Sequence, residues 1–197
     1  MSDSNAEAAA AVEAWPNWVN GCLTLVGPAG CGKTHLASAW AERAGAIVLS
    51  VSDGDFSSHR GRPILLDDAD RRSDDETLFH LLNAAPAGCG VLMTAQITPR
   101  QWPSSLPDLR SRLNALAVTQ INPPDDELLR GVFIKLFRER NIKPAEGVLA
   151  YLVSRIERSV PSAMAIVDQM DRVSGERRRN ITRVLAREIL EGVNDAV

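Results

Sequence analysis

Hydrophobic positions in the first 121 residues alternate between short apolar runs and helically spaced apolar positions. The short runs predict a buried strand at 22–26 and further strands at 46–51, 63–66, 91–95 and 116–121. Helix-forming residues occupy 33–44, and a second helical spacing is carried by Leu78, Leu81, Leu82 and Ala85. Strands that alternate with helices predict an α/β fold with a mainly parallel sheet covered on both faces.

Three local patterns surround these elements. Ser4 or Asn5 can cap a first helix that runs to about Ala14, before Pro16. The segment Ser73–Glu76 forms a capping box ahead of the helix with Leu78. The connection at 52–62 is short, because a parallel crossover usually needs about a dozen residues or more. Either its helix is reduced to a turn, or one of the flanking strands is misassigned.

The pattern changes after Asn122-Pro123-Pro124, where strand-like runs cease. Four apolar helical faces follow, formed by Leu128, Leu129, Val132, Phe133, Leu136 and Phe137; Val148, Leu152, Val153 and Ile156; Ala163, Ile166, Val167 and Met170; and Ile181, Val184, Leu185 and Ile189. We therefore expect a nucleotide-binding α/β domain at 1–121 and an all-helical lid at 122–197.

Composition narrows the class of protein. The chain has 197 residues and a formal net charge of −3, so no broad basic surface for nucleic acid is expected. No apolar run approaches the ~18–20 residues that cross a bilayer, and the N-terminus is polar and acidic. The three cysteines lack metal-type C-x-x-C spacing. These features predict a cytoplasmic location.

The strongest chemical signal is a G-x-x-x-x-G-K-S/T motif between the first predicted strand and the following helix. Its glycines allow successive backbone N–H groups to turn inward and bind phosphates at a helix N-terminus. Lysine contacts the outer phosphates and the threonine hydroxyl binds Mg²⁺. The predicted nucleotide-binding residues are Gly27, Pro28, Ala29, Gly30, Cys31, Gly32, Lys33, Thr34 and His35. The alternative is a glycine-rich turn with an incidental lysine.

A second signal is the apolar strand 63–66, which ends in Asp67 and Asp68. Beside a phosphate-binding loop, Asp67 is predicted to hold the metal together with Thr34, and Asp68 to orient or polarise the attacking water. Aspartate is also common where strands end. The alternative is therefore that Asp67, Asp68 and Asp70 are simply solvated.

Five segments resemble the DnaA-related AAA+ family: GPAGCGKTHL, LLDDAD, VLMTAQITPRQW, LPDLRSRL and INPPDDELLRGVF. The first two resemble its Walker A and Walker B motifs, and the others its sensor-1 strand, arginine-finger box and lid start. ITRVLAREIL is similar to the closing helix of the lid. The chain stops where initiators continue into a helix-turn-helix domain. That architecture is most similar to the Hda group of regulators, of the alphaproteobacterial type.

The resemblance implies a regulator that binds ADP or ATP with Mg²⁺ and acts on the replication initiator DnaA. It would supply an arginine in trans, trigger hydrolysis and so restrain replication initiation, helped by the sliding clamp. By motif position this catalytic arginine is Arg112, with Arg110 as a substitute. Locally, Arg112 can instead pair with Asp108 one helical turn earlier.

The sensor positions are less typical. Thr94 or Gln96 is predicted to contact the γ-phosphate or the attacking water as sensor 1, with Thr94 assigned as catalytic. The family's sensor-2 arginine falls on Pro161, which cannot contact phosphate. Unless Arg155 or Arg158 compensates, intrinsic ATP hydrolysis is expected to be weak.

Several points stay open in the sequence. The family's clamp-binding peptide is not visible, and neither nucleotide preference nor self-association can be read. Trp15 and Trp18 either flank the adenine or pack at the edge of a core. The competing functions are an ATP-driven helicase loader or initiator-like ATPase and a small-molecule P-loop kinase. No sequence-specific DNA binding or membrane association is expected.

Overall fold

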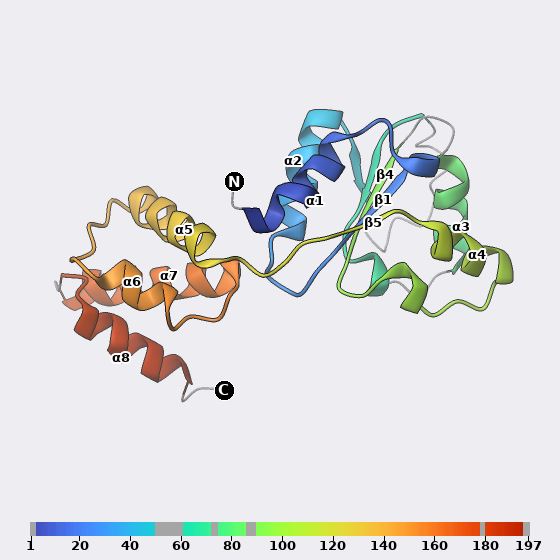
Figure 1. The fold of residues 1–197 in the computed structure, drawn as a ribbon. Coiled ribbons are helices and arrows are strands. Elements are labelled where there is room, and N and C mark those ends of the chain that lie inside the picture. The colour runs from blue at the N-terminus through green and yellow to red at the C-terminus, as the bar shows by residue number, and fades with distance from the viewer. Residues whose placement is uncertain (1–2, 50–60, 72–74, 86–89, 178–179, 195–197) are drawn as a thin grey trace. The chain divides into compact units, whose positions relative to one another are not determined.

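The computed structural model describes residues 3–49, 61–71, 75–85, 90–177 and 180–194. The chain forms two compact units, one spanning Asn5–Asn122 and the other built mainly from Pro123–Val197. The first unit is α/β and the second is helical (Figure 1).

The first unit contains a parallel five-stranded sheet in the order β2-β3-β4-β1-β5, as far as the described residues extend. The strands are β1 (Cys22–Val26), β2 (Ile47–Leu49), β3 (Ile64–Leu66), β4 (Val91–Ala95) and β5 (Val118–Gln120). All five predicted strands are present, so the parallel α/β prediction is confirmed. Both strands flanking the short crossover exist and pair with each other. Most of the predicted connection at 52–62, and the first two residues of the predicted capping box at 73–76, lie outside the described residues.

Two layers of helices cover the sheet. The helices α1 (Asp3–Glu13) and α2 (Lys33–Ala44) lie on one face, and α3 (Asp75–Ala84) and α4 (Pro107–Ala115) lie on the other (Figure 1). Alternate residues of β1 serve the two layers: Leu23 and Leu25 pack toward α1 and α2, whereas Cys22 and Val26 pack toward α3 and α4. Because both faces are covered, every residue of β1, β3 and β4 is buried.

The tryptophans near the N-terminus pack against the core. Trp18 donates its indole N–H to the Ala11 carbonyl at 2.8 Å and lies with its ring 5.2 Å from that of Trp40 on α2. Trp15 meets Trp40 edge-on at 6.0 Å, and the Trp15–Pro16 peptide bond is cis. These contacts favour the packing interpretation of Trp15 and Trp18, since their rings fix the end of α1 on α2.

The second unit contains four helices within its described residues: α5 (Asp126–Glu139), α6 (Val148–Val153), α7 (Val160–Arg177) and α8 (Arg183–Asn194). The start of α5 is capped by Asp125, whose side chain accepts from the Leu128 N–H at 2.7 Å. The buried residues of all four elements form a single cluster around Leu129, Phe133, Leu152 and Val167.

One helical face was predicted wrongly. Val184 is 67% exposed, while Leu185, Ala186 and Ile189 are buried. At about 100° per residue, the three buried positions share one side of α8, and Val184 points away from it. Ile181 is buried but precedes the helix. In the described part of the chain, no helix combines the length and apolar character needed to span a membrane.

Candidate functional site

The loop between β1 and α2 curls because glycine occupies its tightest positions. A Cβ atom on Gly27 would lie 2.4 Å from the Ile121 carbonyl oxygen and 2.8 Å from the Cys31 sulfur, so only glycine fits. Gly30 and Gly32 have φ values of 72° and 103°, a region that side chains disfavour. Gly32 is the N-cap of α2, so the loop leads directly into a helix N-terminus. This geometry is the one that binds phosphates.

The ammonium group of Lys33 lies on the inner side of this loop. Its side chain is buried, and its ammonium group donates to the Gly27 and Pro28 carbonyls at 2.8 Å each. The charge therefore lies within the curl of the loop, where phosphate oxygens can replace the carbonyls as acceptors. His35 is exposed on the first turn of α2.

Asp67 follows β3 and meets hydroxyl groups from two other elements. The Thr34 Oγ1 lies 3.2 and 3.3 Å from the two carboxylate oxygens of Asp67. The Thr94 hydroxyl, at the end of β4, donates to the same carboxylate and accepts from the Asp68 N–H at 2.9 Å. Thus Thr34, Asp67 and Thr94 form one polar cluster at the carboxyl edge of the sheet.

This cluster fits a Mg²⁺ ion. A hydroxyl and a carboxylate are hard oxygen ligands, and Mg²⁺ in nucleotide sites takes one or two protein oxygens together with water and phosphate. Among the described residues there is no group of three or more His, Cys, Asp or Glu that could hold a metal. A full protein cage is therefore absent from that part of the chain, and Thr34 and Asp67 are the residues suited to share the ion with a nucleotide.

Asp68 has an unusual backbone. Its φ is +50°, the left-handed region that non-glycine residues seldom occupy. Its N–H is held by the Thr94 hydroxyl, and its carboxylate is 45% exposed, 3.8 Å from the Arg71 guanidinium. The Asp68 backbone is thus tied to the Asp67 cluster, while its carboxylate stays accessible to water. A backbone strained in this way is often found at functional sites.

The two sensor-1 candidates are placed differently. Thr94 is fully buried, and its hydroxyl is used both as a donor and as an acceptor. Gln96 is only partly buried, one step beyond β4. The geometry makes Thr94 a link between β4 and the Asp67-Asp68 segment, and it leaves Gln96 as the candidate with access to solvent.

Asp70 is a site residue that sequence reasoning missed. One of its carboxylate oxygens accepts from the backbone N–H groups of Gln96 and Ile97, at 2.7 and 3.1 Å. The other oxygen is buried and has no hydrogen-bond partner among the residues that the structure describes. Asp70 therefore ties the short 3-10 turn Ala69–Arg71 to the loop after β4 and is not simply solvated. A third acid three residues after Asp67 was the available signal.

Arg112 lies at the opposite end of β1 from the phosphate-binding loop. It lines a pocket of about 180 Å³ together with Cys22, the first residue of β1, whereas the loop follows Val26, the last. Four residue steps of strand span about 13 Å. The Arg112 side chain is exposed, and its guanidinium lies 5.5 Å from the centre of the Phe79 ring. The described residues show no ion pair between Arg112 and Asp108.

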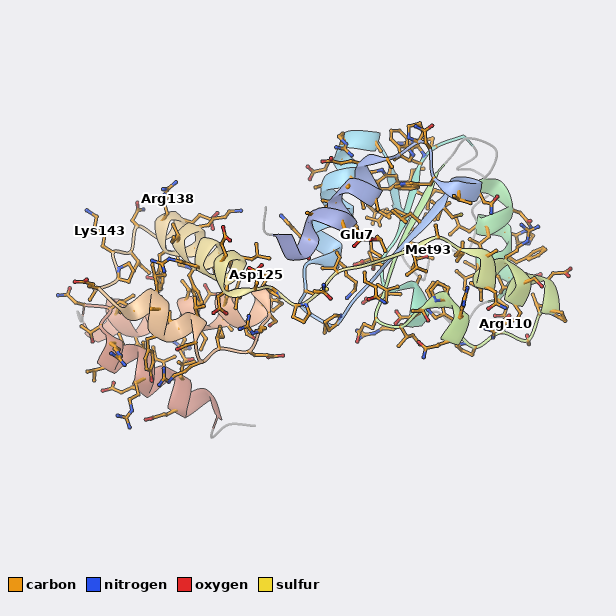
Figure 2. The ribbon with its side chains drawn as sticks, viewed as in Figure 1. Glu7, Met93, Arg110, Asp125, Arg138 and Lys143 are labelled. Atoms are coloured by element: carbon orange, nitrogen blue, oxygen red, sulfur yellow. The ribbon has the colours of Figure 1, made fainter. Side chains whose placement is uncertain are left out.

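Arg110, two residues earlier on α4 and labelled in Figure 2, has a different environment. Its guanidinium donates to the Arg100 carbonyl at 3.2 Å and to the Trp102 carbonyl at 2.6 Å, and the residue is half-buried. These bonds tie α4 to the preceding 3-10 turn Pro99–Gln101. Of the two arginines, Arg112 has the more exposed side chain.

The sensor-2 position and its possible substitutes belong to the second unit. Pro161 occupies the first turn of α7. Arg158 donates to the Pro124 carbonyl and to Asp126, at 3.2 and 2.7 Å. The Arg155 guanidinium lies 4.3 Å from the centre of the Tyr151 ring. Both candidate substitutes therefore already have partners within their own unit.

Comparisons with known proteins agree with this architecture. No family model matches the chain. The chain is 28% identical over 196 residues to the chromosomal replication initiator protein DnaA of Thermomicrobium roseum, a match that covers 85% of this chain and 42% of the initiator. The chain thus spans less than half the length of that relative.

The structural matches show the fold. Domain III of the Thermotoga maritima replication initiation protein DnaA superposes with a TM-score of 0.79 at 18% identity, covering 98% of this chain and 93% of that domain. AMPPCP-bound DnaA from Aquifex aeolicus gives a TM-score of 0.70 at 20% identity, over 89% and 63% of the two chains. Thermotoga maritima RuvB gives 0.74 at 16% identity, over 98% and 70%. The chain has the α/β P-loop fold of DnaA-like AAA+ domains.

Proposed function

We propose that this chain is a nucleotide-dependent AAA+ regulator that binds ADP or ATP and stimulates ATP hydrolysis by the replication initiator DnaA. Arg112 supplies the stimulating charge in trans, and the result is negative control of replication initiation. The similarity of this chain to DnaA supports a complex between the two proteins, because AAA+ domains of similar shape can assemble with one another. The AMPPCP bound by the Aquifex aeolicus relative supports nucleotide binding at the corresponding loop.

Nucleotide binding rests on the glycine loop and its lysine. The backbone N–H groups of 27–34 receive the phosphates, and Lys33 exchanges its two carbonyl acceptors for phosphate oxygens. Thr34 and Asp67 hold the magnesium ion, which neutralises charge on the phosphates when bound. Asp68, with an accessible carboxylate, orients water in this chain's own site.

The observation that carries the regulatory proposal is the position of Arg112. An arginine that acts on a neighbour's nucleotide must be exposed, remote from its own phosphate loop and not neutralised by a carboxylate. Arg112 meets all three conditions, while Arg110 is held by two carbonyls. An arginine supplied in trans stabilises charge that develops on the transferred phosphate in the transition state.

The same reasoning predicts weak intrinsic hydrolysis. Pro161 offers no charge at the sensor-2 position, and Arg155 and Arg158 are engaged elsewhere. The bound nucleotide then serves to set the conformation of this chain rather than to be turned over rapidly.

The test is ATP hydrolysis by the cognate initiator, measured with and without this chain. Arg112→Ala should lower the stimulated rate by about a thousandfold, the scale of a trans arginine. The matched control is Arg43→Ala, which removes an exposed arginine from α2 of the same unit. A stimulated rate that survives Arg112→Ala, with nucleotide binding intact, would overturn the proposal.

A second candidate is an initiator-like or helicase-loading ATPase. It is favoured by the complete set of nucleotide-handling groups at the sheet edge, including the accessible Asp68. This function requires rapid turnover by the chain alone. Single-turnover hydrolysis without any initiator therefore separates the two candidates, because a fast rate that depends on Asp68 favours the second.

A further inference from the structure

The helical unit carries a groove that the nucleotide site does not use. It has a volume of about 530 Å³ and lies between the end of α5, the following loop and the start of α6. Its apolar lining includes Ile134, Phe137, Ile142 and Leu149. Ile134 is 43% exposed, so the apolar surface reaches the rim. The volume falls within the range of about 300–1,000 Å³ in which proteins bind bulky groups.

The charged groups around this groove have one sign. Arg138 and Lys143 line it, and both side chains project away from the helices in Figure 2. No carboxylate contributes to the lining. The rim is therefore positive although the whole chain has a net charge of −3.

The neighbouring cations behave differently. Lys135 is paired with Glu139 at 3.8 Å, and Arg140 is paired with Asp168. Arg138 and Lys143 have no carboxylate within 4.0 Å among the described residues. Lys135 and Arg140, beside the groove, are thus paired, whereas the two cations that line it have no carboxylate partner in the described part of the chain. A ligand with carboxylates would complement them.

The lining of the groove favours a protein segment over nucleic acid as its ligand. Single strands are held by exposed aromatic rings on which bases stack, but Phe137 is only 2% exposed. An apolar floor with a charged rim is the arrangement that accepts an amphipathic helix, with apolar residues spaced three or four apart. We propose that this groove docks an acidic amphipathic segment of a protein partner. This inference concerns a different surface from Arg112 and does not depend on the proposed function.

In the proposed complex, two apolar side chains on one face of the partner segment contact Ile134, Ile142 and Leu149. Carboxylates on either side of that face contact Arg138 and Lys143. The apolar contacts set most of the affinity, and the ion pairs select the charge of the partner and make binding sensitive to salt.

The experiment uses the full chain and three labelled synthetic peptides, followed by fluorescence anisotropy. One peptide is an amphipathic helix of Leu and Glu, the second replaces each Glu with Lys, and the third shuffles the first. We expect the acidic peptide to bind, more weakly at high salt, and the other two to bind at least about tenfold less well.

Matched variants locate the binding. Ile134→Glu should weaken the acidic peptide by about tenfold or more, whereas Val184→Glu, at an exposed valine of the same unit, should not. Arg138→Glu with Lys143→Glu should shift preference toward the Lys peptide. Arg130→Glu with Arg172→Glu, which changes two exposed arginines outside the groove, should leave preference unchanged.

Three results would overturn the inference: no binding of the acidic peptide, equal binding of the acidic and basic peptides, or equal loss in the control variants. Circular dichroism of Ile134→Glu checks that the helical unit is retained. A fourth result also excludes a separate partner. If the chain self-associates and Ile134→Glu abolishes that association, the groove is occupied by a second copy.

Discussion

The two ends of the parallel sheet in the first unit are built in opposite ways. At the carboxyl edge, Thr34, Asp67, Thr94 and the backbone of Asp68 bond to one another in a dense polar cluster. At the amino edge, Arg112 is an exposed cation beside the phenyl ring of Phe79. A site that handles its own ligand needs groups that are pre-positioned by one another, because loosely held groups lose rate. A group that acts on a partner must keep its charge available.

Loss of the phosphate-loop lysine should give the largest effect at the carboxyl edge. Lys33→Met removes the buried ammonium and should weaken ADP and ATP binding by about 100-fold or more, since its charge faces the phosphates. Isothermal titration calorimetry measures this. As a control, Lys135→Met changes an exposed lysine in the other unit and should bind normally. Equal affinity in wild type and Lys33→Met would contradict the site assignment.

A backbone change tests whether the loop depends on close packing. Gly27→Ala places a Cβ atom 2.4 Å from the Ile121 carbonyl and should destabilise the fold by about 2–3 kcal/mol. Gly131→Ala is the matched control, because the new Cβ on helix α5 has no heavy atom within 4 Å apart from its chain neighbours and the backbone of the helix itself. That change should stabilise by about 0.5–1 kcal/mol. Urea unfolding of both variants gives the comparison.

The two arginines of α4 should separate stability from activity. Arg110→Ala removes two bonds to carbonyls and should cost about 1–2 kcal/mol of unfolding free energy. Arg112→Ala should cost no more than about 0.5 kcal/mol, since its side chain is exposed. Thermal unfolding and stimulated initiator hydrolysis should then rank the two variants in opposite orders. If both measurements ranked the two variants in the same order, the proposed difference in role between Arg110 and Arg112 would be wrong.

The smallest expected effect concerns Cys22, which lines the same pocket as Arg112. Burial raises the pKa of the Cys22 thiol from 9.0 to about 12, against an opposing effect of the Arg112 charge. The folded state therefore favours the protonated thiol. The protonated thiol contributes fully to the stability of the fold below pH 9.0, its ordinary pKa, and this contribution is lost as the pH rises toward 12. At pH 8.5, iodoacetamide should label Cys22 slowly until urea is added, as followed by mass spectrometry. Rapid labelling of Cys22 in the native protein would contradict this expectation, because it would show that this thiol is accessible.

The parallel sheet and the phosphate loop could be predicted because their signals are local. A five-residue apolar run before a glycine loop, as at 22–26, identifies a buried strand without knowledge of its neighbours. The order of the strands could not be predicted, because crossovers allow several arrangements of the same elements. The exposed Val184 shows a further limit. Val184 was correctly predicted to lie in a helix, but the prediction that it is buried was wrong. Adjacent residues differ by about 100° in direction around a helix, so Leu185 is buried and Val184 is not.

The residues of the candidate site also divide into those that local sequence could predict and those that depend on contacts between distant segments. Lys33 and Thr34 follow from motif spacing along one segment. The hydrogen bonds of Asp70 could not be predicted, because its partners Gln96 and Ile97 lie more than 25 residues away and are reached only through the sheet. Thr94 was predicted to touch phosphate or water, yet its bonds to Asp67 and to the Asp68 backbone depend on the pairing of β4 with β3.

By itself, the sequence determined the nucleotide loop, the parallel α/β class and the helical character of residues after 122, since each depends on neighbouring residues along the chain. Only the tertiary structure distinguished Arg110 from Arg112. Two positions apart on a helix differ by about 200° in direction, and nothing in the local pattern says which direction meets the carbonyls of Arg100 and Trp102. Packing decides which side chains keep their hydrogen-bonding capacity for a partner, because it brings together groups that are distant in sequence.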